Sequence, residues 1–567
     1  MILRRSFARV AVVYRPGIVF CLGLAGLAGC SLWETPSAST QGPDGVLPSI
    51  VTVKLVADMA VPWNMDADSI EGIGVVTCLT GTGSDPEPSA ERAMLEAEMK
   101  TRGITSPSTM LASKNTSLVL LRAFVRPGAQ KGDRVDVEVR IPSRSETTSL
   151  AGGYLLETRL KEMRILDSRI HDGHPLALAE GPILIDPVST AEKNADKNHV
   201  AACKGRILGG AVMLKDRPLM LVLTPGHRSI SSSARIEAAI NRRFHTVDKG
   251  IQAGVAKAKT EQYVELRMHP RYKNDIERYM NVVRAVAIQE TAAERADRIG
   301  QLQRQLLDFT DGTASLHAAL QLEAVGHEAI AALLAGMKSE NLGVRFYAAE
   351  ALAYLDQHEA AECLAQIARE SPPFRVFALS ALGAMEDRSA YEVLCTLLDA
   401  PSAETRYGAF RALREMNAQE RIVAADPEVK AFSYHVLKTA GPTMIHVTHS
   451  RYPEIVLFGA DQRFRPTLAV NAGSQILVTG AGTDQISVSK FAVGEPDQKR
   501  IVTTRVDEVI RAIADLGGTY PDVVQALEEA KKADVIDSRF EVDALPEAGR
   551  VYDPVDHDAS ALDSKKA

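Results

Sequence analysis

Two clusters of residue types in this sequence could support chemistry. In Gly81-Thr82-Gly83, two glycines flank a hydroxyl, as in loops whose backbone N–H groups bind phosphate. The full pattern G-x-x-x-x-G-K-[ST] is absent, so we interpret this segment as a tight turn. His171-Asp172-Gly173-His174 holds two imidazoles, which are potential metal ligands. It has neither an H-E-x-x-H pattern nor a third ligand nearby, so we interpret it as a polar hairpin turn.

Carboxylates and serines give no clear catalytic pattern. Asp133, Asp136 and Glu138 are close in sequence but form no obvious acid pair. A G-x-S-x-G nucleophile motif is absent. We therefore expect no enzymatic activity, no catalytic residue, no cofactor and no metal.

The elements around these residues are strands separated by glycine turns. Val75-Val76 leads into Gly81–Gly83, and Ser89 can cap a helix over about 90–102. Polar and apolar residues alternate over 134–139, which is typical of a strand buried on one face. This region is therefore predicted to have an α+β fold.

Motifs in this region resemble the flagellar basal-body P-ring protein family. They are Ile73-Gly74-Val75-Val76, Gly81-Thr82-Gly83, Gly132-Asp133-Arg134-Val135-Asp136-Val137 and Ser149-Leu150-Ala151-Gly152-Gly153-Tyr154-Leu155-Leu156. The resemblance extends over about 70–290 and returns at about 455–545, where two amphipathic helices are separated by Gly517-Gly518. It implies structural roles for Gly74, Gly81, Thr82, Gly83, Gly132, Asp136, Gly152 and Gly153.

An internal repeat lies between these two regions. Arg345-Phe346-Tyr347-Ala348 recurs as Arg375-Val376-Phe377-Ala378 and as Arg406-Tyr407-Gly408-Ala409. Each copy precedes an Ala-Leu pair, and an apolar partner helix is expected between copies. The pattern resembles HEAT-type repeats and predicts an inserted all-α solenoid. The repeated arginines could form a binding row, but we interpret them as solvated and structurally paired.

The N-terminus has the features of an export signal. Four arginines precede an apolar stretch, and Leu27-Ala28-Gly29-Cys30 resembles the bacterial lipobox. Cys30 is therefore the expected lipidation site. A plain signal peptide or a short anchor helix remains the alternative.

Charge and cysteine content narrow the class of protein. The formal net charge is −7 over 567 residues, so the sequence does not have the basic character expected of a nucleic-acid-binding protein. Export would permit disulfides, and a Cys78–Cys203 bridge stays open.

These observations predict seven segments. They are a signal peptide (1–29), a tether (30–50), a P-ring-like α+β region (51–290), a helical connector (291–312), HEAT-like repeats (313–425), a C-terminal P-ring-like region (440–545) and a disordered tail (546–567).

The resemblance implies a structural subunit of the P-ring, the periplasmic bushing around the flagellar rod. Its expected partners are further copies of itself, rod and L-ring proteins, and a membrane, most simply the outer membrane, through the Cys30 lipid. The lipobox and the repeats depart from the family pattern. The alternative is a lipid-anchored envelope adaptor outside the motor that binds a partner protein through its repeats.

Overall fold

The computed structural model describes residues 53–546 except 167–168, 186–201, 249, 309–311, 418, 493 and 495. Cys30, the export signal, the tether and residues 547–567 lie outside the described residues. In the described ranges, no helix combines the length and apolar character needed to cross a bilayer. Strands and helices are both abundant, so the predicted α+β fold with an all-α insertion is confirmed.

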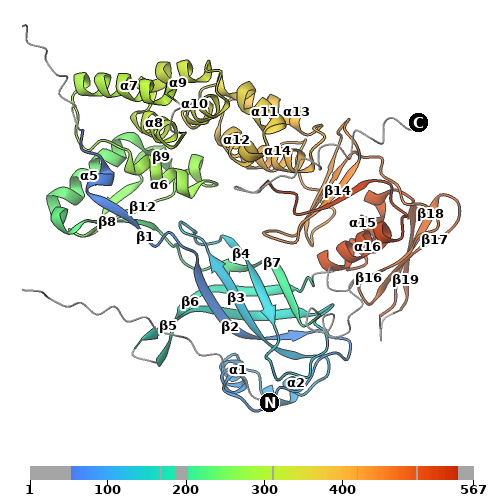
Figure 1. Cartoon of the computed structure of the whole chain (residues 1–567). Helices are drawn as coiled ribbons and strands as arrows, with labels where there is room; N and C mark the ends of the chain where they lie inside the picture. The colour runs from blue at the N-terminus through green and yellow to red at the C-terminus, as the bar shows by residue number, and fades with distance from the viewer. Residues whose placement is uncertain are drawn as a thin grey trace, which may run out of the picture. The chain divides into compact units, whose positions relative to one another are not determined.

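Six strands close into an antiparallel barrel in the order β2-β3-β4-β7-β6-β5 (Figure 1). They are β2 (Asp68–Thr77), β3 (Ser117–Val125), β4 (Arg134–Arg140), β5 (Tyr154–Leu166), β6 (Arg169–Pro182) and β7 (Lys204–Met213). Alternate side chains fill the interior, among them Ile70, Val137 and Leu160. Helices α1 (Ala90–Thr101) and α2 (Pro107–Leu111) connect β2 to β3 and lie at one end of the barrel.

The barrel corrects one detail of the turn prediction. His171–His174 lies within β6, where Asp172 pairs with Met163, so the segment is part of a strand and not a turn. Periodicity alone does not limit the length of a strand, so the sequence did not indicate that β6 already begins at Arg169.

A second sheet packs against helices in the same N-terminal region. Its order is β1-β8-β12-β11, formed by β1 (Ala60–Trp63), β8 (Leu219–Leu223), β12 (Tyr263–Leu266) and β11 (Ala256–Ala258). Helices α5 (Ile230–Arg243) and α6 (Ile276–Arg284) bury Ile236, Ile240 and Val283 in the adjoining core. The short helices η1 (Val56–Asp58), η2 (Pro225–His227) and η3 (Pro270–Tyr272) and the hairpin β9 (His245–Asp248)–β10 (Ile251–Gly254) complete the region.

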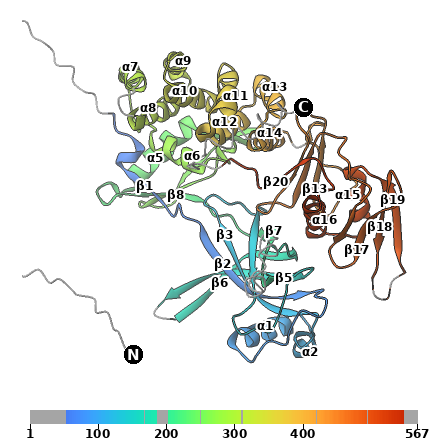
Figure 2. The same cartoon turned by 45° about the vertical axis from the view of Figure 1, so that its right-hand side comes forward.

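The repeat forms two layers of helices, which Figure 2 shows from the side. One layer holds α8 (Gly312–Val325), α10 (Leu342–Tyr354), α12 (Pro372–Ala384) and α14 (Ala403–Met416). The other holds α7 (Ala292–Leu307), α9 (Ile330–Met337, after η4 at His327–Ala329), α11 (Ala360–Glu370) and α13 (Arg388–Leu397). Helix α7 lies in the segment expected to be a helical connector (291–312), and its Leu302 and Leu306 belong to the core of the repeat, so α7 is packed as part of the stack.

The C-terminal region combines two sheets with two helices. One sheet has the order β13-β15-β14-β20, with β13 (Ser433–Leu437), β15 (Glu454–Phe458), β14 (Met444–Val447) and β20 (Arg539–Val542). The other runs β16 (Ala469–Ala472), β17 (Ile476–Gly480), β18 (Gln485–Lys490) and β19 (Gln498–Thr503). The expected helices are α15 (Val506–Asp515) and α16 (Tyr520–Lys532), separated by Gly517 at φ +86°. Their apolar faces fill one core with both sheets.

Candidate functional site: motif turns and the joints of the repeat

Gly81-Thr82-Gly83 forms a turn whose polar groups bind other parts of the chain. The N–H of Gly83 donates to the carbonyl of Lys114 (2.8 Å), and the Thr82 hydroxyl donates to the carbonyl of Ser149 (2.8 Å). A Cβ on Gly83 would lie 2.1 Å from the carbonyl oxygen of Thr116, so only glycine fits there. These contacts support the turn interpretation rather than a phosphate cradle.

The other motif glycines serve packing or turns. A Cβ on Gly74 would meet the Thr158 hydroxyl at 2.7 Å, and one on Gly153 would meet Val76 at 2.5 Å. Gly132 and Gly152 have open surroundings and positive φ, so they permit turns. Gly74 and Gly153 thus leave room for neighbouring side chains, whereas Gly132 and Gly152 allow the backbone to turn.

Asp136 joins three segments of the chain. A bulge between β4 and β7 lies at this residue, and its carboxylate accepts the N–H of Gly209 (2.7 Å) from β7. The other carboxylate oxygen accepts the N–H of Arg451 (2.6 Å), far along the chain. Asp133 has separate contacts, with the N–H of Gln130 and with Arg126. Asp136 is therefore a structural tie, and the two acids do not form a catalytic pair.

The described residues contain no group of three or more His, Cys, Asp and Glu side chains that could hold a metal ion. Cys78 is an exposed free thiol, whereas Cys203 is buried and its thiol contacts the carbonyl of Thr147 (3.4 Å). The Cys78–Cys203 bridge left open by the sequence is therefore not formed.

A buried ionic cluster joins α6 to the first helices of the repeat. Arg278 on α6 contacts Glu323 on α8 (Nε–Oε2 3.1 Å) and forms an ion pair with Glu350 on α10. The Tyr272 hydroxyl donates to the second Glu323 oxygen (2.7 Å), and the Tyr354 ring lies under the Arg278 guanidinium (4.7 Å). All these side chains are buried. The cluster makes the repeat continuous with the preceding α+β region.

Two carboxylates share the single guanidinium of this cluster. Desolvation raises the pKa of Glu350 to about 7, although the charge of Arg278 acts in the opposite direction. Sequence reasoning missed the cluster. The signal that could have revealed it is a single acid within an otherwise apolar helix, as at Glu323 and Glu350, because a buried glutamate needs a partner.

A second buried cluster joins the last repeat helix to the C-terminal sheet. Glu454 on β15 accepts a hydrogen bond from the Tyr407 hydroxyl of α14 (2.7 Å) and pairs with Arg414. His446 on β14 stacks on Tyr407 (3.5 Å between ring centroids) and accepts the N–H of Ala544 (3.0 Å). Desolvation lowers the pKa of His446 to about 3, so its ring is neutral at pH 7.

The three repeated arginines are structurally paired, but two of them are not solvated. Arg345 donates to carbonyls that follow α9, Arg375 to the carbonyl of Ala368 (3.0 Å), and Arg406 to that of Leu398 (3.0 Å). Each thus satisfies carbonyls at the end of the preceding helix. Arg375 and Arg406 are buried, so these arginines do not form an exposed binding row.

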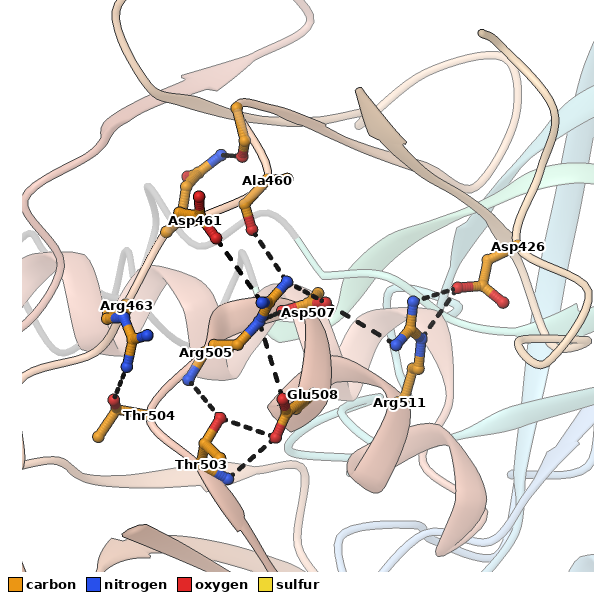
Figure 3. Close-up of polar contacts among 12 residues, drawn as sticks. Asp426, Ala460, Asp461, Arg463, Thr503, Thr504, Arg505, Asp507, Glu508 and Arg511 are labelled. Carbon is orange, nitrogen blue, oxygen red and sulfur yellow. Dashed lines mark hydrogen bonds and ion pairs between the residues drawn. The ribbon is translucent and has the colours of Figure 1, made fainter. Parts of the chain in front are cut away.

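Charged residues also anchor the start of α15, as Figure 3 shows. The Arg505 guanidinium binds both carboxylate oxygens of Asp507 (3.0 and 3.1 Å), and Arg511 pairs with Asp426 (2.7 Å). Glu508 accepts from the backbone N–H and the hydroxyl of Thr503 at the end of β19. Acidic side chains in the first turn of a helix are stabilising, because they interact with the positive end of the helix dipole. We assign this cluster to the packing of the C-terminal region.

Comparisons with known proteins find matches in two parts of the chain. Residues 56–298 match the family described as "Flagellar P-ring protein", and residues 374–400, which include most of α12 and all of α13, match "PBS lyase HEAT-like repeat". A flagellar P-ring protein of Thermotoga maritima is 29% identical over 250 residues, covering 42% of this chain and 68% of the relative.

Two further P-ring relatives show a similar degree of likeness. The protein of Desulfotalea psychrophila is 33% identical over 207 residues (34% of this chain, 50% of the relative). That of Geobacter sulfurreducens is 29% identical over 260 residues (44% and 64%). The matched region thus spans about half to two thirds of the length of these relatives. The match to the P-ring family ends at residue 298, before the C-terminal sheets, so the resemblance at 455–545 stays a prediction. Residues 56–298 of this chain are therefore similar to flagellar P-ring proteins, and residues 374–400 are similar to HEAT-like repeats.

Proposed function

We propose that this chain is a structural subunit of the flagellar basal-body P-ring, assembling with further copies of itself in the periplasm around the rod, next to the L-ring. The observation that carries the proposal is the P-ring match across the barrel and the second sheet. The motif residues act through turns and packing, which suits a building block rather than an enzyme. The proposed role involves no catalysis and no cofactor.

We further propose that the repeat is a rigid part of this subunit. It contacts another protein through the helix layer that contains α9, α11 and α13. The Arg278 and Glu454 clusters attach it at both ends. The layer of α9, α11 and α13 exposes charged side chains, such as Glu362, Arg388 and Glu392. Such a surface can recognise a partner of complementary charge.

Lipidation at Cys30 would hold the subunit at the envelope, most simply at the outer membrane. The support is the lipobox-like sequence before Cys30. Metabolic labelling with a radioactive fatty acid tests this directly. The full chain should incorporate label and a Cys30→Ser variant should not; an equally labelled variant would refute the assignment.

A lipid-anchored adaptor outside the motor is the second candidate, favoured by the exposed charged layer of the repeat. Purified hook–basal bodies from the native organism distinguish the two. The ring proposal expects peptides of this chain in constant proportion to rod and hook proteins, and loss of swimming on deletion. Basal bodies that form normally without the chain would support the adaptor.

A further inference from the structure

A concave surface on the outside of the barrel collects positive charge. The cavity has a volume of about 540 Å³ and is lined by β3, β4, β7, Leu184 and His449. Four of its lining side chains are cationic, namely Arg122, Arg140, Lys204 and Arg206, and one is acidic, Glu138. These charged side chains project from the outer face of the barrel. On β4, for example, Val137 and Val139 are buried inside the barrel, so Glu138 and Arg140, which alternate with them, point outward.

The strand register places these charges in two rows across the barrel wall. In one row Glu138 lies opposite Arg122 on β3 and opposite Arg206 on β7, so charges alternate. In the next row Arg140 lies directly opposite Lys204, with Leu120 on the other side. The second row therefore brings two cations together without an acid between them.

The cations differ in what they bind. Arg122 forms an ion pair with Glu71 (2.7 Å), and Arg206 donates to the carbonyl of His449 (3.1 Å). Arg140 and Lys204 are exposed and have no ion pair within the part of the chain that the structure describes. Like charges directly opposite on neighbouring strands destabilise a sheet. An anion between the two side chains would relieve this repulsion.

We propose that this cavity binds a phosphate-type oxyanion, held by Arg140 and Lys204. A guanidinium presents a planar fork that matches phosphate oxygens, and an ammonium adds a compact charge. Arg206, already bound at one nitrogen, lies one row away at the edge of the cavity. The volume fits a small ligand or the headgroup of a larger one. The proposal is independent of ring assembly.

Thermal unfolding of the full chain, with Cys30→Ser to prevent acylation, tests the site with pyrophosphate as the probe. Pyrophosphate at about 100 times its Kd should raise the unfolding midpoint by about 3 °C. The Arg140→Gln/Lys204→Gln double variant should lose this shift. It should also unfold at a higher midpoint than the parent without ligand, since the repulsion is gone; a merely structural role for the two cations predicts a lower one.

Arg159→Gln is the matched control, because Arg159 is an exposed arginine on β5 of the same barrel and outside the cavity. It should keep the full pyrophosphate shift. Equal shifts in the parent and the double variant, or the same shift with NaCl at matched ionic strength, would overturn the proposal.

The source of the phosphate is tested separately by co-sedimentation with vesicles. Binding to phosphatidylglycerol–phosphatidylcholine vesicles that depends on Arg140 and Lys204 identifies a lipid headgroup. A pyrophosphate shift without vesicle binding identifies a soluble phosphate compound. Either result upholds the oxyanion site. The absence of both the pyrophosphate shift and vesicle binding would refute it.

Discussion

Arg278 and Glu323 form a fully buried ion pair between α6 of the P-ring region and α8 of the repeat (Nε–Oε2 3.1 Å). Removing two charges from water is unfavourable unless geometry and hydrogen bonding compensate. Here the Tyr272 hydroxyl and Glu350 complete the surroundings. These buried contacts join the repeat to the α+β region that precedes it.

We predict that Arg278→Met strongly destabilises the protein. The variant leaves the Glu323 and Glu350 carboxylates buried without a cation, which costs about 3–5 kcal/mol in free energy of unfolding. Urea denaturation followed by circular dichroism measures the change. Arg388→Met, at an exposed arginine on α13, should change the free energy by less than about 0.5 kcal/mol. Similar effects of the two substitutions would argue against a buried joint.

Glu350 should make stability fall as the pH rises through neutrality. Its pKa of about 7 in the folded protein lies above the ordinary value of 4.5, so the folded state binds more protons in this interval. The stabilisation is fully present below about pH 4.5 and lost as the pH rises through 7, by a few kcal/mol. Glu350→Gln should flatten the free energy of unfolding between pH 5 and 8. An unchanged pH profile in this variant would contradict the prediction.

His446 should produce the opposite dependence on the acid side. Burial lowers its pKa to about 3 from an ordinary 6.5, so the unfolded state binds more protons below pH 6.5. Stability should therefore decrease as the pH falls from 6.5 towards 3. His446→Phe keeps an aromatic ring against Tyr407 and should weaken this acid sensitivity, at some cost from the unpaired N–H of Ala544. Urea titrations at several pH values give the slope for both proteins.

Asp136→Ala should loosen the tie between the barrel and the segment around Arg451. It leaves the N–H groups of Gly209 and Arg451 without their acceptor, which costs about 1–3 kcal/mol. Hydrogen exchange at these two amides should accelerate markedly. Glu87→Ala, at an exposed acid, serves as the control. Unchanged exchange at Gly209 and Arg451 would show that the carboxylate does not hold them.

Gly83→Ala should destabilise the P-ring region, since its Cβ would lie 2.1 Å from the carbonyl oxygen of Thr116. The backbone must move to relieve that contact, and overpacking of this kind costs about 1–3 kcal/mol. Gly300→Ala on α7 has open space around its Cβ and should instead stabilise by up to about 1 kcal/mol. The midpoints of thermal unfolding of the two variants should therefore move in opposite directions.

Periodic and locally determined features were predictable. The apolar partner helices expected between the copies of the repeat are present as α11 and α13, because apolar spacing indicates a helical face. The capped start of α1 at Ser89 follows from a side-chain hydrogen bond to Arg92, three residues away. Strands β13, β14, β18, β19 and β20 were not anticipated, since short strands in mixed sheets carry a weak pattern.

The P-ring-like motifs, the glycine turns and the repeat period could be recognised from the sequence, because each depends on residues near one another in the chain. Which buried charges meet became apparent from the three-dimensional structure. Helices α7, α8 and α9 separate Arg278 from Glu350 along the chain, and 315 residues separate Asp136 from Arg451. Such contacts depend on packing between distant elements, and no local pattern encodes their distance. The same reason applies to Arg140 and Lys204, which become opposing cations only when β4 pairs with β7.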